Sequence, residues 1–197
     1  MTDDVLASLP VRRGHFRLES GLHTDLWLDL EGLFVSPRDL APLTTALAGR
    51  LRPHCVSAVC GPLQGGAFLA QSVATALGAF FFFSEPLTPV VSAGLFRSQY
   101  RIPESIRGRL RGERVALVDD VISAGSSVRA TAKALDAAGA TTVVVGSLLV
   151  LGAVALDHFA GLGIPVESLG RRDFALWSPA ECPLCRAGAS LEDRIPC

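Results

Sequence analysis

The stretch VALVDDVISAGSS, residues 115–127, decides the fold class. It runs from four apolar residues into the adjacent carboxylates Asp119 and Asp120 and then into a hydroxyl-rich turn around Gly125. The apolar run is typical of a buried strand, and the sequence after it predicts a helix over 127–138 that ends at Gly139. A strand, a glycine turn and a helix in this order indicate one unit of an α/β sheet.

The same pattern recurs along the chain. Strands are predicted at 56–60, 79–83 (the buried run AFFFF), 141–150 and 165–169, helices at 37–51 and 67–77, and a long loop or hairpin at 84–114. Apolar strands that alternate with amphipathic helices favour an α/β fold with a parallel sheet covered on both faces. Ligands bind beyond the carboxyl ends of such strands, where GPLQGG, 61–66, and the turn at 121–127 are both expected.

Before this sheet, two short strands around Ser20 and Gly21 predict a small N-terminal hood over about residues 1–35. The hood and sheet together make one domain, 1–176, and a tail with a CxxC motif follows at 177–197. The sequence leaves open whether this tail folds over the core or reaches a partner subunit.

Composition narrows the function classes. The chain has 197 residues, is 49% hydrophobic and carries a formal net charge of −1. No cluster of Lys and Arg marks a nucleic-acid or anionic-membrane surface, so neither partner is expected. The longest near-continuous apolar stretch, 143–156, is shorter than a membrane span, and the acidic N-terminus lacks a signal-peptide core, so we expect a cytoplasmic protein.

The turn at 122–127 has the chemistry of a phosphate cradle. Backbone N–H groups at a helix start and three serine hydroxyls bind phosphate well, and glycine lets the backbone approach the ligand. Two carboxylates beside a phosphate would repel it unless they bind sugar hydroxyls or Mg²⁺. A ribose 5-phosphate satisfies both halves of the motif. The alternative is a polar strand end that caps the next helix.

These residues resemble a known family. VALVDDVISAGSS is similar to the 5-phosphoribosyl 1-pyrophosphate (PRPP) signature of type I phosphoribosyltransferases, and GPLQGG resembles their pyrophosphate loop. GHFRLESGLHTDLWLDLEGLF, 14–34, resembles the N-terminal segment of the orotate phosphoribosyltransferases, the most similar group within the family. The resemblance covers about residues 14–170 and implies the type I phosphoribosyltransferase fold with its hood.

It also implies a reaction, the transfer of phosphoribose from PRPP to a nitrogen base with release of pyrophosphate. Asp119 and Asp120 would bind the ribose hydroxyls and help to hold Mg²⁺. The remaining substrate-binding positions would be Ser123, Ala124, Gly125, Ser126 and Ser127 at the 5-phosphate, Pro62, Leu63, Gln64 and Gly65 at the pyrophosphate, and Ser20 and Gly21 at the base. The family also implies a homodimer.

The base side departs from the orotate pattern. Glu19 stands where those enzymes usually have lysine, and a carboxylate there would repel anionic orotate. Residues 84–114 lack the lysines and histidine of the family's catalytic loop, so we expect Arg97 and Arg101 to meet the pyrophosphate unless they are ordinary surface charges. The acceptor is therefore left open, and a non-catalytic PRPP- or nucleotide-binding regulator on the same fold is the alternative function.

Five cysteines without a secretory signal argue against a disulfide framework. Cys182 and Cys185 form half of a zinc motif, with Cys197 as a third ligand at most; free thiols in a surface tail are the simpler interpretation. His15 and His23 are base-pocket candidates, although solvent-facing strand positions are the more common case.

Overall fold

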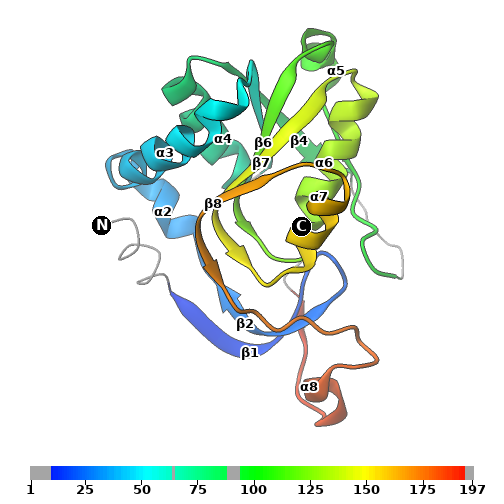
Figure 1. Ribbon diagram of the computed structural model, residues 1–197. Helices are drawn as coiled ribbons and strands as arrows, with labels where there is room; N and C mark the ends of the chain where they lie inside the picture. The colour runs from blue at the N-terminus through cyan, green and yellow to red at the C-terminus, as the bar shows by residue number, and fades with distance from the viewer. Residues whose placement is uncertain (1–9, 64, 88–93, 194–197) are drawn as a thin grey trace.

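A six-stranded sheet in the order β5-β4-β3-β6-β7-β8 forms the centre of the computed structural model, which describes residues 10–63, 65–87 and 94–193 (Figure 1). Neighbouring strands from β4 to β8 run parallel, and only the two-residue edge strand β5 is antiparallel. The strands are β3 (Ala58–Pro62), β4 (Phe80–Pro86), β5 (Tyr100–Arg101), β6 (Arg114–Ile122), β7 (Thr141–Leu151) and β8 (Val166–Arg172). The predicted parallel α/β sheet is confirmed.

Helices cover both faces of this sheet, as a parallel sheet requires. Buried leucines of α3 (Pro37–Leu51) and buried residues of α4 (Gly65–Leu77) pack on one face, next to the short α2 (Glu31–Val35). α6 (Ser126–Ala137) and α7 (Val154–Gly161) pack on the other, where Leu135 and Phe159 are fully buried. Ser36 caps α3 by accepting from the Asp39 N–H, and a proline opens the helix, as predicted.

The AFFFF run is less buried than predicted. Phe82 is buried, but 62% of Phe80 is exposed, and the burial along β4 alternates. The reason is that β4 lies close to the edge of the sheet: it pairs along its length with β3 on one side but with only two residues of β5 on the other. The segment predicted as a loop or hairpin contains, besides β5, the short α5 (Glu104–Arg107) and the 3-10 turn Gly108–Leu110. A second 3-10 turn, Arg52–His54, follows α3.

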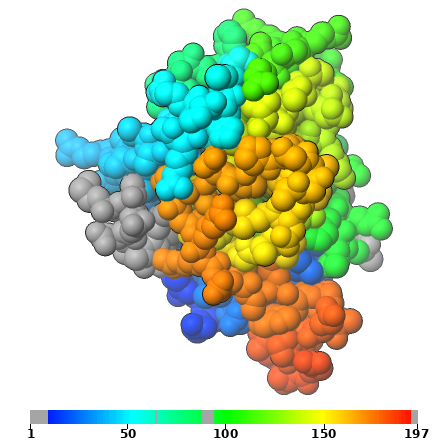
Figure 2. Space-filling view, viewed as in Figure 1, coloured from blue at the N-terminus to red at the C-terminus, as the bar shows by residue number. Residues whose placement is uncertain are grey.

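A three-stranded sheet in the order β2-β1-β9 makes the hood. β1 (Val11–Arg17) and β2 (His23–Leu28) are antiparallel, and β9 (Glu192–Asp193) from the tail pairs parallel with β1. A bridge between His23 and Trp177 fixes the start of the tail, and α8 (Pro183–Arg186) lies between these two attachments. Figure 2 shows the tail, in orange and red, packed beside the blue hood.

The described tail therefore folds back onto the hood of its own chain. Within the described ranges, no helix is both long and apolar enough to cross a bilayer.

Candidate active site

A cavity opens between the hood and the carboxyl ends of the central strands, where both glycine turns were predicted to meet. The hood contributes one wall and the turn 121–127 another. Eleven of the predicted site residues line it: Ser20, Pro62, Leu63, Gly65, Asp119, Asp120, Ser123, Ala124, Gly125, Ser126 and Ser127. Gly21 turns the chain beside the cavity without lining it, and Gln64 lies outside the described residues.

The two aspartates belong to β6, which continues through them to Ile122. Both carboxylates face the first turn of α4, and that turn has room for them only because it carries two glycines. A Cβ on Gly65 would lie 2.3 Å from Asp120 Oδ2, and one on Gly66 would lie 2.5 Å from Asp119 Oδ1. The glycines of GPLQGG thus allow the carboxylates to approach the helix start, which explains their place in the sequence.

Hydrogen bonds hold the Asp119 carboxylate in this position. Ser127 Oγ donates to its Oδ2 over 2.7 Å, and the Asp120 N–H donates to its Oδ1 over 3.1 Å. The Asp120 carboxylate in turn accepts from the Val121 N–H over 2.8 Å. Two carboxylates are therefore oriented side by side on a rigid central strand.

The charged forms of the two carboxyl groups are unfavourable when no ligand is bound. Burial, reinforced by the neighbouring Asp120 charge, raises the pKa of Asp119 well above its ordinary value. Burial raises the pKa of Asp120 as well. Unfavourable burial of carboxylate charge at the end of a strand is typical of a functional site, because ligand hydroxyls or a bound cation stabilise the charged form.

The turn before α6 is a candidate anion cradle. Gly125 has a φ of +80° and a Cβ there would lie 3.0 Å from the Ala155 Cβ, so both backbone geometry and space favour glycine. Ser126, only 8% exposed, has a hydroxyl without a hydrogen-bond partner among the described residues. A buried polar atom of this kind at a helix start fits a phosphate oxygen. Ser127, by contrast, turns its hydroxyl to Asp119.

Three aromatic side chains and a third carboxyl group also line the cavity, contributed by the hood, β5 and the segment after β8. Trp27, Tyr100 and Phe174 line it together with Glu19. Burial raises the pKa of Glu19, while hydrogen bonds from Ser98 and Tyr100 partly offset the shift. Burial and the negative charge of Glu19 raise the pKa of the Tyr100 phenol, which stays protonated and donates to Glu19. No arginine or lysine is among the described residues that line the cavity.

The two arginines predicted to meet pyrophosphate are exposed and do not line the cavity. Arg101 pairs with Glu85 over 2.8 Å on the β4–β5 edge. Contact of Arg97 and Arg101 with pyrophosphate stays a prediction. Tyr100 and Phe174 were not anticipated from the sequence; Tyr100, the only tyrosine of the chain, lies within the segment predicted as a loop.

His15 and His23 are neither solvent-facing nor part of the cavity. They are 4% and 3% exposed and lie between the hood and the tail. The expectation that they face solvent was wrong because the tail covers this side of the hood.

Comparison with known proteins agrees with this geometry. The sequence profile described as "Phosphoribosyl transferase domain" matches residues 54–155. An orotate phosphoribosyltransferase of Thermotoga maritima is 34% identical over 179 residues, which cover 91% of this chain and 88% of that protein. The chain belongs to the phosphoribosyltransferase family. A second orotate phosphoribosyltransferase, from Caldanaerobacter subterraneus, is 29% identical over 181 residues, 92% of this chain and 88% of that protein.

Solved structures of phosphoribosyltransferases share the fold. An orotate phosphoribosyltransferase from Aeropyrum pernix superposes with a TM-score of 0.64 at 25% identity, covering 87% of this chain and 93% of that one. An adenine phosphoribosyltransferase from Thermoanaerobacter pseudethanolicus has a TM-score of 0.68 at 18% identity, covering 87% and 100%. The latter likeness concerns the fold alone. The type I phosphoribosyltransferase fold predicted from the PRPP-like signature is thus confirmed.

Proposed function

We propose that this phosphoribosyltransferase transfers phosphoribose from PRPP to a neutral nitrogen base in a Mg²⁺-dependent reaction. The observation that carries the proposal is the cradle itself: Asp119 is buried and Asp120 half-buried beside Gly65 and Gly66. Ser126, whose buried hydroxyl has no hydrogen-bond partner among the described residues, lines the same cavity. The carboxylates would accept hydrogen bonds from the ribose hydroxyls. The start of α6 would bind the 5-phosphate through its backbone N–H groups.

In the reaction the C1–O bond to pyrophosphate breaks and its electrons leave with pyrophosphate, a C1–N bond to the base forms, and the base releases its N–H proton to solvent. The ribose ring carries positive charge as the leaving group departs, and the buried carboxylates would stabilise that charge. The donor set of Asp119 and Asp120 consists of hard oxygens, which suit Mg²⁺. When bound, Mg²⁺ supplies neutralisation of the pyrophosphate charge. The protein's own contribution is then to position both substrates in line.

The acceptor is expected to present hydrogen-bond donors rather than a carboxylate. Glu19 and Trp27 both line the cavity. A flat ring bound there would stack on the indole and direct its N–H groups to the accepting carboxylate. Orotate would instead bring a second negative charge to a wall with no lining cation among the described residues. Neutral pyrimidines and purines are therefore favoured over orotate, in contrast to the names of the two orotate phosphoribosyltransferase relatives described above.

The test is pyrophosphate release from PRPP and Mg²⁺ with a panel of bases: orotate, uracil, cytosine, adenine, hypoxanthine and guanine. Turnover with a neutral base and little with orotate is the expected result. Efficient use of orotate would refute the argument from Glu19 while leaving the PRPP site intact.

One observation favours a second candidate, a non-catalytic PRPP-binding regulator. The described cavity wall lacks any lysine or arginine that would meet a departing pyrophosphate, and Arg97 and Arg101 are exposed outside it. Calorimetric binding of PRPP together with silence across the whole panel would favour the regulator. Absence of PRPP binding would remove both candidates.

A further inference from the structure

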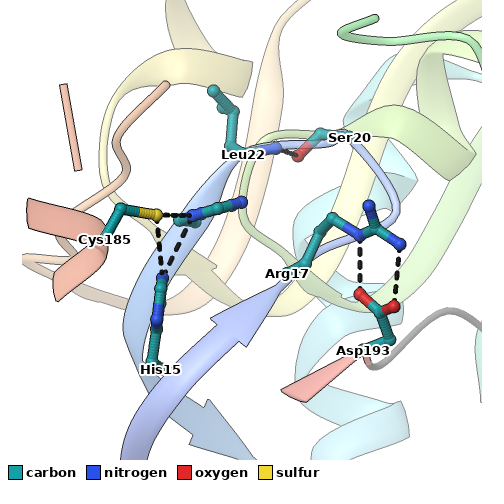
Figure 3. A network of polar contacts seen from close by, with 7 residues as sticks. His15, Arg17, Ser20, Leu22, Cys185 and Asp193 are labelled. Atoms are coloured by element: carbon teal, nitrogen blue, oxygen red, sulfur yellow. Dashed lines mark hydrogen bonds and ion pairs between the residues drawn. The ribbon is translucent and has the colours of Figure 1, made fainter. Parts of the chain in front are cut away.

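A second cluster of reactive side chains lies away from the cavity, where the tail meets the hood. It comprises His15 and His23 from the hood and Cys182 and Cys185 from the tail, and their four candidate ligand atoms all lie within 4.8 Å of one another. Three of the four residues are buried. Figure 3 shows His15 and Cys185 pointing toward one another, next to the Arg17–Asp193 ion pair that also joins hood and tail.

We infer that these four residues form a structural Zn²⁺ site that fastens the C-terminal tail to the hood. Nothing in the proposed transfer reaction requires such a site, and none of the four residues lines the cavity. The inference goes beyond that reaction and does not depend on it.

Four of the six distances between the ligand atoms are close to the edges of a small tetrahedron. Zn–S bonds near 2.3 Å and Zn–N bonds near 2.05 Å place tetrahedral ligand atoms about 3.3–3.8 Å apart. His15 Nε2 lies 3.1 Å from His23 Nδ1 and 3.4 Å from Cys182 Sγ. Cys185 Sγ lies 3.6 Å from His15 Nε2 and 3.3 Å from His23 Nδ1. The two remaining separations, from Cys182 Sγ to Cys185 Sγ and to His23 Nδ1, are no longer than 4.8 Å, so side-chain rotations that shorten them would bring all four atoms to a single ion.

The orientation of His15 also fits a metal ligand. Its Nδ1 lies 3.0 Å from the carbonyl oxygen of Ala189, so this nitrogen carries the proton and donates to that oxygen. Nε2 is left with its lone pair directed at the other three residues. One lone pair accepts one good hydrogen bond, whereas three groups converge on it here. A backbone carbonyl that fixes the non-ligating nitrogen is the usual support of a zinc-bound histidine.

Hood geometry brings the two imidazoles together. His23 pairs with Arg17 across the β1–β2 ladder, His15 lies where the ladder shifts register between Arg13 and Phe16, and the two imidazole centroids are 5.0 Å apart. The tail then supplies both cysteines from one turn, Cys182 as the residue before α8 and Cys185 within it. Two sulfurs from a CxxC turn and two imidazoles from a hairpin form a Cys₂His₂ set.

The net charge of the metal and its ligands is compatible with burial. Each thiol gives up its proton on binding, so two thiolates and one Zn²⁺ sum to no net charge. A tetrahedral S₂N₂ set selects Zn²⁺ over Mg²⁺ or Ca²⁺, which prefer oxygen. Cys185 is exposed, which leaves a route for the ion to enter. The sequence had suggested Cys197 as the third ligand, but that residue lies outside the described residues and the two histidines complete the set.

The test is the metal content of the full chain, purified with any affinity tag removed and dialysed against a weak chelator. About one zinc per chain is expected in the wild type. Cys182→Ser with Cys185→Ser should lose it, and His23→Asn should weaken it. Cys55→Ser, which changes an exposed cysteine outside the cluster, is the matched control and should retain the metal. Zinc-free wild-type protein, or iron in place of zinc, would overturn the inference.

Cobalt substitution keeps the test decisive if the double variant fails to fold. Wild-type protein stripped of metal and given Co²⁺ should show the intense visible bands of tetrahedral cobalt and a thiolate-to-metal charge-transfer band. Weak octahedral bands, or a Cys182–Cys185 disulfide found by mass spectrometry of the freshly purified protein, would contradict it. Removal of zinc should also lower the melting temperature of the wild type but leave that of the double variant unchanged.

Discussion

The substitution Gly66→Ala tests whether the aspartates are held against the start of α4. Its Cβ would lie 2.5 Å from Asp119 Oδ1 and 2.7 Å from Pro62 Cδ, far inside ordinary van der Waals contact. The carboxylate or the helix start must therefore move by close to an ångström. Overpacking of this kind costs about 1–3 kcal/mol. For a chain of this size that corresponds to a fall in melting temperature of about 2–12 °C.

The displaced carboxylate should also weaken PRPP binding. A hydrogen bond to a charged group contributes about 1.5–3 kcal/mol, so the loss of one such bond to the ribose predicts an affinity roughly 10–100-fold lower. The assays are differential scanning calorimetry without ligand and isothermal titration calorimetry with PRPP and Mg²⁺.

Gly49→Ala is the matched control. Gly49 is an exposed residue inside α3, and a Cβ there would meet nothing within 4 Å. Alanine in a helix interior is more favourable than glycine by about 0.5–1 kcal/mol, so this variant should be slightly more stable and bind PRPP normally. If Gly66→Ala behaves like Gly49→Ala in both assays, the close approach of Asp119 to α4 is wrong, and with it the explanation of the glycine pair.

Three further predictions concern the same cavity. Asp119→Asn should raise the melting temperature of the ligand-free protein. Because burial raises the pKa of Asp119, the wild type loses stability as pH rises from the ordinary carboxyl pKa toward the raised one, so the difference in melting temperature between variant and wild type should grow in thermal unfolding from pH 5 to 8. A variant that is less stable at every pH would contradict this. Burial raises the pKa of Glu19, so kcat/KM for the base should fall on the acid side at a pH above the ordinary glutamate pKa, and Glu19→Gln should remove that fall. Glu19→Lys should raise orotate use. An unchanged pH profile and unchanged orotate use would count against the role assigned to Glu19. Gly125→Ala should cost about 1–2 kcal/mol because φ is +80°, seen as a melting temperature lower by about 2–8 °C, and a melting temperature equal to that of the wild type would argue against the turn geometry.

Much of the fold could be predicted because local and global signals agree along the central sheet. The strand β3, the stretch of β6 before the aspartates and most of β7 are apolar in sequence, and the structure buries these residues between helices on both faces. The aspartate pair and Gly125 mark a strand end and a helix start by their own chemistry, so the site could be located without knowledge of the tertiary structure.

The rest depended on contacts between residues distant in sequence. His15 and His23 read as exposed strand residues because nothing near them in the sequence announces the tail, more than 150 residues later, that buries them. Phe80 read as core because its exposure depends on how short the neighbouring strand β5 is. Tyr100 could be recognised only once the segment containing it was seen to pair with β4 and approach Glu19.

Calorimetric titration of the wild type and of the double variant Asp119→Asn, Asp120→Asn with PRPP and Mg²⁺ tests the central claim most directly. The wild type should bind PRPP at one site per chain. The variant should lose that binding while unfolding cooperatively at an equal or higher temperature, since it lacks one buried and one half-buried carboxylate whose charged forms are disfavoured by burial. Equal affinity in the two proteins, or no binding by the wild type, would show that the aspartate pair and the cradle beside it do not form a phosphoribose site.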